Sequence, residues 1–320
     1  MEIANTRKGR IQTTPTDCAV CGSKEYTPFT KGYDYEYASC TNTFRIVQCA
    51  SCSHLYLNPK PPLREFPTIY PDTYYAYDFL NEKKLAPAKI AKRFIEKRYI
   101  KLYRELIGPS GSILDVGCGD GRLLAVLKNA KGCAWNLSGI DFNKKGNRRA
   151  TQKGLTIYET TFEAIRLQKR SFNLIIMNEV FEHFYDATSA LKKVKTLLKP
   201  GGYFVIETPC PESWDFKLFK NAYWGGYHIP RHINLFTRTA IAMILEKEGF
   251  RIIEQRPLPS PPFWILSIHN MLLDRGWNHH IVRFFNFYNP LLLAIFTLID
   301  LLQMMLGPTS TMRVIARKEQ

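Results

Sequence analysis

Acidic residues are scarce in this sequence. Asp and Glu together number 28 against 44 Lys and Arg, so the formal net charge at pH 7 is +16. This excess favours an anionic partner, such as nucleic acid, an acidic membrane face or a phosphorylated substrate, and a basic surface that serves solubility explains it equally well. Residues 1–17 lack an apolar core, so we expect no secretory signal and a cytoplasmic location.

Long apolar runs are absent as well. The two most apolar stretches, 263–273 and 291–306, are shorter than the roughly 20 residues that cross a bilayer. Both lie in the segment 257–310, which separates two strand-like stretches of one expected sheet, so a single crossing is excluded. We expect an apolar helical insertion with three roles open: a hairpin in the membrane interface, a lid over a lipid-like substrate, or a face for homodimerisation.

A few residues of the insertion bear on that choice. Trp264 and Trp277, with two arginines close by, suit an interfacial position and hence a peripheral place on the inner face of the membrane. Asp300 and Gln303 argue against deep immersion, because polar side chains are costly in hydrocarbon.

Four of the eight cysteines form two C-x-x-C pairs near the N-terminus. The pairs are Cys18 with Cys21 and Cys49 with Cys52. Each pair can present two thiolates from a tight turn, and two such turns complete the closed tetrahedral site that is typical of structural zinc. We therefore expect a small zinc-ribbon module with its linker over residues 1–62, followed by the main domain over 63–320.

The stretch Ile113–Gly121 is an apolar run that ends in a cluster of glycines, and Arg122–Lys128 follows with helical spacing. It predicts a strand, a tight turn and a helix whose first amides face the turn, an arrangement that suits ligand binding. Asp115 precedes the turn. A second strand-like run ends in Asp141, where an open parallel sheet would hold a ribose.

Strand-like and helical stretches alternate around this motif, which predicts an α/β fold with a parallel sheet and right-handed crossovers. The further expected strands are 155–158, 172–178, 203–208, 250–255 and 312–317, and the expected helices are 87–107, 143–152, 187–198 and 238–248.

The glycine motif with its two acids resembles the cofactor site of class I S-adenosylmethionine-dependent methyltransferases, whose pattern is hydrophobic-hydrophobic-Asp-x-Gly-x-Gly-x-Gly. The resemblance implies a Rossmann-like seven-stranded sheet with an antiparallel last strand, and S-adenosyl-L-methionine as cofactor. It places these residues against the cofactor: Asp115, Gly117, Cys118, Gly119, Asp141, Phe142, Thr161, Phe162 and Asn178.

The segment Asn178–His183 is similar to the Glu-Val-x-Glu-His pattern of ubiquinone-biosynthesis O-methyltransferases. That resemblance implies a divalent cation at Glu179, Glu182 and His183. His183 can instead act as a base, or cap and pack the helix that follows.

The loop Tyr223–Phe236 falls where these enzymes bind the acceptor. It carries His228 and His232 among aromatic residues, and an imidazole, with an ordinary pKa of about 6.5, suits a general base. Hydrogen bonding to the backbone is an equally open role for either. The region also resembles nucleotide-sugar C-methyltransferases, which share the four-cysteine module, but of their His-Glu-His triplet only the last position, His232, is matched.

These features predict a methyltransferase that acts on a small-molecule, sugar or lipid-linked acceptor at oxygen, with His183, His228 and His232 as catalytic candidates. The Asn/Asp-Pro-Pro-aromatic motif of enzymes that methylate amino groups of bases is absent after residue 178. Two alternatives stay open: a zinc-containing rRNA methyltransferase, and a catalytically silent scaffold that binds cofactor or membrane. Nucleic acid is the less favoured partner.

Overall fold

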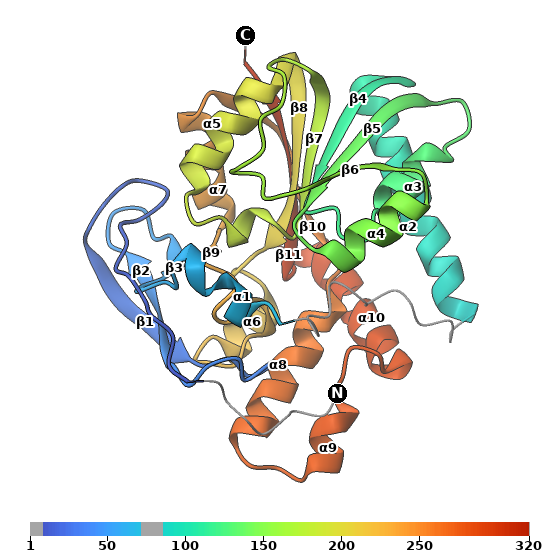
Figure 1. The fold of residues 1–320 in the computed structure, drawn as a ribbon. Coiled ribbons are helices and arrows are strands. Elements are labelled where there is room, and N and C mark those ends of the chain that lie inside the picture. The colour runs from blue at the N-terminus through green and yellow to red at the C-terminus, as the bar shows by residue number, and fades with distance from the viewer. Residues whose placement is uncertain (1–8, 72–85, 320) are drawn as a thin grey trace.

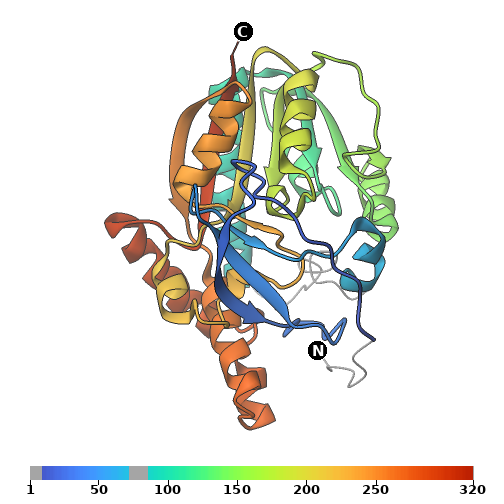
Figure 2. The ribbon, with the colours of Figure 1, turned by 90° about the vertical axis from the view of Figure 1, so that its left-hand side faces the viewer.

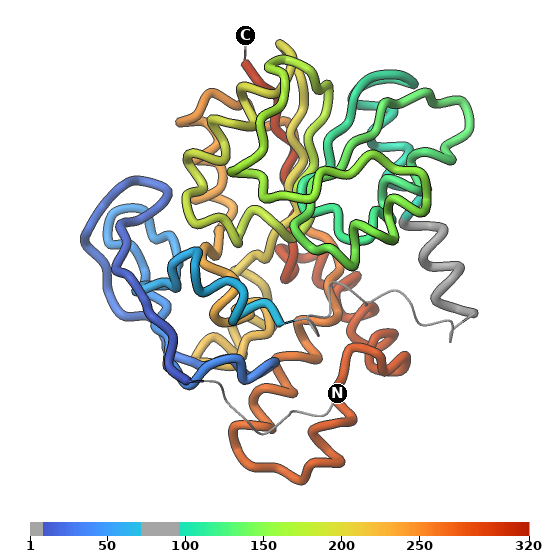
Figure 3. Tube along the Cα trace, in the orientation of Figure 1, coloured from blue at the N-terminus to red at the C-terminus, as the bar shows by residue number. Residues whose placement is uncertain are grey.

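The computed structural model describes residues 9–71 and 86–319, with side chains described from residue 96 onward in the second range. A seven-stranded sheet forms the centre of the molecule, flanked by helices on both faces, and a smaller sheet from the N-terminal region packs beside it (Figure 1). The chain trace in Figure 3 shows the C-terminus at the opposite end of the molecule from the helices that follow residue 260.

The large sheet has the strand order β10-β11-β8-β7-β4-β5-β6. Neighbours from β8 to β6 run parallel, whereas β11 is antiparallel to both β8 and β10. The strands are β4 (Ser110–Val116), β5 (Ala134–Asp141), β6 (Thr156–Glu159), β7 (Phe172–Asn178), β8 (Leu198–Pro209), β10 (Phe250–Leu258) and β11 (Thr311–Lys318). The predicted Rossmann-like sheet with an antiparallel last strand is confirmed.

Helices cover both faces of this sheet because successive strand residues point in opposite directions. In β7, Leu174 and Ile176 join the core that includes α2 and α3, whereas Ile175 and Met177 join the core that includes α5 and α7. The helices are α2 (Ala86–Ile107), α3 (Arg122–Lys128), α4 (Lys144–Gln152), α5 (Ala187–Leu197) and α7 (Arg238–Lys247). Polar side chains cap α4, α5 and α7 at their N-termini, which explains where these helices begin.

The N-terminal region forms a second, four-stranded sheet. Its own strands are β1 (Tyr26–Gly32), β2 (Phe44–Cys49) and β3 (Leu55–Leu57), which are antiparallel. The fourth strand, β9 (Asn234–Leu235), comes from the loop that carries two of the candidate histidines, and pairs with β3. Short helices η1 (Leu63–Glu65) and α1 (Phe66–Ile69) follow β3. This pairing fixes the histidine loop between the N-terminal sheet and the main domain.

The segment between β10 and β11 folds as three helices: α8 (Pro261–Asp274), α9 (His279–Phe284) and α10 (Pro290–Leu306). The remaining short helices are η3 (Phe181–His183), α6 (Trp214–Phe219) and η4 (Gly225–Tyr227). Figure 2 shows α8 to α10 extending away from the two sheets. The expected apolar helical insertion is confirmed, and none of the described helices is both long and apolar enough to span a bilayer.

Candidate active site

The glycine-rich turn after β4 is tied to the end of β5 by hydrogen bonds. The N–H groups of Gly117 and Cys118 both donate to the carbonyl oxygen of Ile140, at 2.8 and 3.1 Å. The N–H of Gly119 donates to Asp141 Oδ2 at 2.9 Å, and Asp141 Oδ1 accepts a second backbone N–H at 2.8 Å. The Asp141 carboxylate is therefore held in one orientation at the carboxyl end of β5, the edge where open α/β sheets bind ligands.

Two glycines of the turn serve different purposes. Gly117 and Gly119 both have positive φ, +74° and +56°, a region that side chains disfavour. A Cβ on Gly117 would lie 2.4 Å from Val180 Cγ2, whereas a Cβ on Gly119 would meet nothing within 4 Å. Gly117 thus permits packing against the loop after β7, and Gly119 leaves open space beside Asp141 for a ligand.

Two more polar residues at this edge fit a cofactor that carries positive charge. Burial, and next the charge of Asp141, raise the pKa of Asp115 to about 8, so a nearby cation would favour its charged form. Asn178 ends β7, and its Oδ1 is buried without a hydrogen-bond partner. Such an orphaned acceptor is expected where a ligand completes the bonding.

The remaining predicted cofactor residues lie in mixed surroundings. Phe142 is 50% exposed, and its ring centroid is 6.1 Å from that of Tyr70 in an edge-on arrangement. Thr161 is exposed, and its hydroxyl accepts a backbone N–H within its own turn. Phe162 is buried and packs edge-on against Phe184, with 5.8 Å between ring centroids. Of these residues, Phe142 presents the most open ring surface beside the glycine turn.

The three candidate catalytic histidines come together from two distant parts of the chain. His183 lies in η3, directly after β7, and His228 and His232 lie in the loop after η4. The ring centroid of His232 is 4.7 Å from that of His183 and 4.9 Å from that of His228, and His183 and His228 are 6.5 Å apart. This histidine cluster, His183, His228 and His232, sits at the same edge of the sheet as Asp141.

Each imidazole of the cluster has its Nδ1 beside an acceptor. The pairs are His183 Nδ1 with the Arg231 carbonyl oxygen at 3.0 Å, His228 Nδ1 with Glu36 Oε1 at 2.6 Å, and His232 Nδ1 with the Gly226 carbonyl oxygen at 2.8 Å. Tyr70 Oη also lies 2.9 Å from His183 Nδ1. Carbonyl oxygens only accept, so in the neutral rings of His183 and His232 the proton belongs on Nδ1 and Nε2 is the basic atom.

Glu182 is fully buried between two of these rings. Its Oε2 accepts from the Thr208 hydroxyl at 3.0 Å. Its Oε1 has no hydrogen-bond partner and lies 3.9 Å from His183 Nε2 and 3.7 Å from His232 Nε2. Burial raises the pKa of Glu182 to about 8, and burial together with the charge of His228 lowers the pKa of His183 to about 3.

Three atoms that can accept a proton or bind a cation thus converge in the described part of the chain, a setting that suits a proton or a metal cation. The atoms from Glu182, His183 and His232 lie within 4.8 Å of one another. Of the three residues expected to hold a divalent cation, Glu182 and His183 belong to this group, and His232 is its third member in place of Glu179. Glu179 instead accepts from the Thr311 hydroxyl at 3.4 Å.

Two acids from the loop between β1 and β2 reach into the cluster. Glu36 bonds His228, as above, and Asp34 forms a buried ion pair with Arg231 through two hydrogen bonds of 3.1 and 2.8 Å. Burial alone would raise the pKa of Asp34, but the Arg231 guanidinium lowers it to about 2. Sequence reasoning missed both acids, because no local pattern links partners 192 and 197 positions apart.

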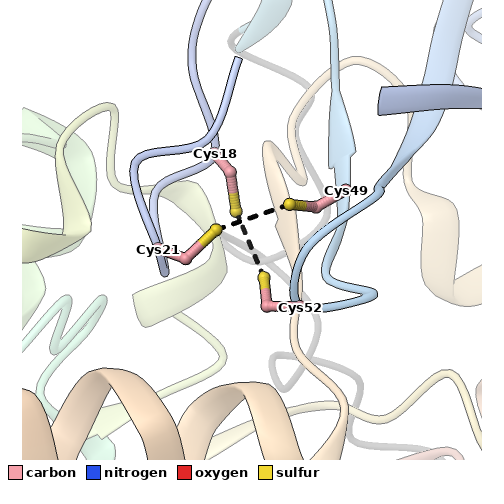
Figure 4. Close-up of side chains that lie close together, drawn as sticks. All are labelled: Cys18, Cys21, Cys49 and Cys52. Atoms are coloured by element: carbon pink, nitrogen blue, oxygen red, sulfur yellow. Dashed lines mark hydrogen bonds between the residues drawn. The ribbon is translucent and has the colours of Figure 1, made fainter. Parts of the chain in front are cut away.

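The four predicted zinc ligands converge at one point, as Figure 4 shows. Cys18 Sγ is 3.5 Å from Cys52 Sγ, and Cys21 Sγ is 3.4 Å from Cys49 Sγ. A zinc ion with bonds of about 2.3 Å to four tetrahedral thiolates separates the sulfurs by about 3.8 Å, so the residues fit the ion with a shift of a few tenths of an ångström.

The two halves of this thiolate group repeat one turn geometry. In each, the first cysteine donates its N–H to the carbonyl five residues on, and its carbonyl accepts the N–H four residues on. The residue at that fourth position, Gly22 or Ser53, has positive φ in both halves, +80° and +59°. Two equivalent turns that each present two sulfurs are the arrangement that a closed structural zinc site requires.

Removing two thiolates tests the zinc assignment. The double substitution Cys18→Ser and Cys49→Ser is expected to lower bound zinc from about one ion per chain to below about a tenth, because each half loses a ligand. Metal analysis by mass spectrometry of the purified protein measures this. Cys133→Ser, which lies outside the group, is the matched control. Equal zinc content in the double variant and the unmodified protein would refute the site.

Comparisons with known proteins agree with this geometry. The family model described as "Methyltransferase domain" matches residues 89–255, just over half of the chain. A ubiquinone biosynthesis O-methyltransferase of Cereibacter sphaeroides is 33% identical over 51% of this chain and 70% of that protein. The 2-methyl-6-phytyl-1,4-hydroquinone methyltransferase of Synechocystis is 24% identical over 66% of this chain and 73% of that protein.

Other relatives are matched over less of their length, 49% for a sarcosine/dimethylglycine N-methyltransferase of Halorhodospira halochloris and 42% for another ubiquinone biosynthesis O-methyltransferase. Among solved structures, a Galdieria sulphuraria protein assigned as a sarcosine dimethylglycine methyltransferase superposes with a TM-score of 0.51 at 15% identity, over 72% of this chain and 88% of that one. This likeness shows the fold.

Proposed function

The chain belongs to the class I S-adenosylmethionine-dependent methyltransferases, and on that premise we propose that it methylates a hydroxyl oxygen of a small-molecule, sugar or lipid-linked acceptor. The observation that carries the proposal is the histidine cluster, which lies at the same edge of the sheet as Asp141. A hydroxyl must lose its proton when it gains a methyl group. A neutral imidazole whose Nε2 is unprotonated can take that proton.

The residues around the glycine turn fit the cofactor. S-adenosyl-L-methionine, when bound, supplies a methyl group that is already electrophilic because it is attached to a sulfonium sulfur. Asp141, fixed by two backbone N–H groups, would accept the ribose hydroxyls. Asp115 would face positive charge, and the open space at Gly119 would admit the ligand. These groups contribute by positioning the reacting atoms, which accounts for a large part of the acceleration in such displacements.

His232 is the base that the geometry favours. When the acceptor oxygen gains the methyl group, His232 Nε2 would take the proton that the hydroxyl loses. The carbonyl of Gly226 accepts a hydrogen bond from His232 Nδ1 at 2.8 Å, which favours one orientation of the ring. Glu182 Oε1 lies 3.7 Å from the Nε2 that gains the proton, and the new positive charge would favour the ionised form of Glu182, which compensates it.

The carboxylate of Glu36 acts as a positioning group for this site. It holds His228 at 2.6 Å, and His228 packs against His232. Glu36→Gln is expected to lower kcat by about 100-fold with KM for the cofactor nearly unchanged, because the neutral amide holds the ring less firmly. Steady-state kinetics measures this, and Glu36→Asp should recover part of the loss.

Glu25→Gln is the matched control for this substitution, because Glu25 is an exposed acid of the same module. It should leave kcat unchanged. A kcat for Glu36→Gln within twofold of the unmodified enzyme would show that the pair has no part in positioning the ring.

A divalent cation is compatible with the same group of atoms. Glu182, His183 and His232 offer one carboxylate and two imidazole ligands, a set that suits Zn²⁺, Mn²⁺ or Fe²⁺, and the orphaned Glu182 Oε1 fits the role. Such an ion would lower the pKa of a bound hydroxyl. Transfer that survives dialysis against a chelator would assign the step to the imidazoles alone, and recovery on adding one metal would assign it to the ion.

The relatives support a hydroxylated acceptor, since their names include a ubiquinone biosynthesis O-methyltransferase and a hydroquinone methyltransferase. The rRNA alternative is weakened by the missing Asn/Asp-Pro-Pro-aromatic motif after residue 178. A hollow lined by six basic and two acidic residues lies elsewhere, at the start of β7, about 20 Å along the strand from the site. Its basic residues are Lys169, Arg170, Lys192, Lys195, Lys247 and Lys318.

Acceptor chemistry tests the proposal directly. Methyl-labelled cofactor is supplied with hydroquinones, sugars and lipid-linked phenols that bear one free hydroxyl, and with the same compounds whose hydroxyl is blocked. Incorporation only into the free hydroxyl supports the proposal. Equal incorporation into the blocked compounds would place the methyl group on carbon or nitrogen and would contradict it.

A further inference from the structure

Helix α10 buries mainly polar side chains and exposes apolar ones. Its buried residues are Leu292, Asp300 and Gln303, so two of the three are polar. The large side chains that it exposes are all apolar, with Leu298 69% and Met305 82% accessible. The exposed set, called the apolar face below, is Leu291, Ile295, Leu298, Leu301, Leu302, Met305 and Leu306.

The buried polar residues explain this inversion. Asp300 Oδ1 accepts from Trp264 Nε1 at 2.9 Å, and Asp300 Oδ2 accepts from the Ser260 N–H at 2.6 Å, at the start of α8. The Gln303 side chain donates to the Pro308 carbonyl. Asp300 and Gln303 therefore face the protein interior, so the expectation that they oppose deep immersion does not bear on the face that α10 exposes. Trp264, expected at an interface, is buried instead.

The apolar face forms one continuous stripe. Its members recur at spacings of three and four residues, which places them on one side of a helix. Leucines left in water forgo the free energy that burial would provide, so a stripe of this size favours a partner. No charged side chain interrupts it, because Asp300, the one charged residue of α10, is buried.

The connection from α8 through α9 has the composition of a membrane interface. Its exposed aromatic, basic and aliphatic residues are Arg275, Trp277, His279, His280, Ile281, Arg283 and Phe284, and Gly276 and Asn278 are exposed among them. Aromatic rings and basic side chains next to an apolar surface are typical of helices that lie at the boundary of a bilayer. Asp274, the exposed acid beside them, accepts a hydrogen bond from the Tyr223 hydroxyl at 2.6 Å.

The insertion also begins and ends at the edge of the sheet that carries the candidate active site. It leaves after Leu258 and returns at Thr311, which pairs with Leu258 and with Pro209 at the end of β8. On its inner side, Ser267 of α8 accepts the N–H of Gly225, in the turn before the histidine loop, at 2.8 Å. Helix α8 therefore contacts the loop that carries the histidines, and α10, which is joined to α8 through Asp300 and Trp264, exposes the apolar face.

We propose that the apolar face and the α8–α9 connection rest on a phospholipid surface that contains anionic lipid. A second copy of the chain fits this face less well, because two chains of net charge +16 repel each other, whereas anionic lipid attracts that charge. This docking does not depend on the proposed reaction. It would bring the edge of the sheet that carries the candidate active site close to lipid-linked molecules.

Vesicle binding by the full-length protein tests the proposal. Co-sedimentation is measured with vesicles of phosphatidylcholine alone and of phosphatidylcholine with phosphatidylglycerol, and we expect stronger binding to the second. Leu298→Asp combined with Leu302→Asp should lower the partition coefficient by about tenfold or more, because charge is costly in the hydrocarbon boundary. Leu218→Asp, at a 70% exposed position of α6 outside the face, is the matched control.

Cofactor binding by calorimetry shows whether the double variant keeps its fold, since the substituted side chains are exposed. Arg275→Gln with Arg283→Gln, as a second variant, should weaken binding to the anionic vesicles alone. Unchanged vesicle binding by Leu298→Asp/Leu302→Asp would overturn the proposal. A second result would also overturn it. In that result the unmodified protein binds neither kind of vesicle and forms a dimer in analytical ultracentrifugation, whereas the Leu298→Asp/Leu302→Asp variant is a monomer.

Discussion

His232→Gln is expected to lower kcat for methyl transfer by about 1,000-fold while the affinity for S-adenosyl-L-methionine stays within about twofold, since general bases contribute 10²–10⁴ to such steps. The ring lies at the centre of the histidine cluster, with Nδ1 fixed by the Gly226 carbonyl and Nε2 beside Glu182 Oε1. Glutamine keeps polarity near the same place but cannot take a proton. Single-turnover kinetics with a saturating acceptor measures the chemical step.

His279→Gln is the control for this variant, because His279 is an exposed residue of α9 outside the cluster. It should leave the single-turnover rate unchanged with a soluble acceptor. If His232→Gln keeps the rate of the unmodified enzyme, the base lies elsewhere. A loss that appears equally in cofactor affinity and melting temperature would assign His232 a structural role instead.

Asp141→Ala should weaken binding of S-adenosyl-L-methionine by about 100-fold or more. The carboxylate is fixed by two backbone N–H groups at 2.9 and 2.8 Å, and charge-assisted hydrogen bonds to a ligand are worth about 1.5–3 kcal/mol each. Tenfold in affinity corresponds to about 1.4 kcal/mol, so losing two such bonds gives at least this effect. Isothermal titration calorimetry measures it.

Asp120→Ala provides the comparison for Asp141→Ala. Asp120 is an acid of the same glycine turn, but it bonds Lys153 Nζ at 3.0 Å and not the turn's backbone. Its loss should change cofactor affinity by less than about threefold, as expected for a surface ion pair. Equal losses for Asp120→Ala and Asp141→Ala would mean that the turn, and not a ribose contact, was disturbed.

The sheet could be predicted from the sequence because its signals are local. Alternating strand and helix periodicity, with a glycine turn after Asp115, already fixes parallel strands and crossovers. Strand pairing then brings Asp141 beside the turn, since parallel strands end at one edge. The thiolate group was predictable for the same reason, because each pair of cysteines is a turn in itself.

The finer arrangement of the site depends on contacts between distant parts of the chain. Glu36 and Asp34 belong to a loop whose sequence gives no sign of a bond to His228 or Arg231. β9 joins β3 across a similar separation. Such pairings follow from how the two sheets pack, and no periodicity records them. The N-terminal module therefore supports the site directly.

The apolar insertion shows a second reason why part of the structure could not be predicted from the sequence. Its helices were predictable, but the direction of Asp300 and Trp264 was not, because each could face solvent or its neighbour. The hydropathy of the sequence is the same whether these side chains face solvent or the neighbouring helix. Only the packing of α8 against α10 shows that the polar atoms satisfy each other inside and that leucines remain outside.

One measurement tests the central claim most directly. Purified protein and its His232→Gln variant are each incubated with methyl-labelled S-adenosyl-L-methionine and an extract of cells that lack the protein, and RNA, protein, lipid and soluble metabolites are then separated. The account predicts label in the lipid or metabolite fraction, as an ether that the variant fails to form. Label in RNA, or equal labelling by both proteins, would contradict it.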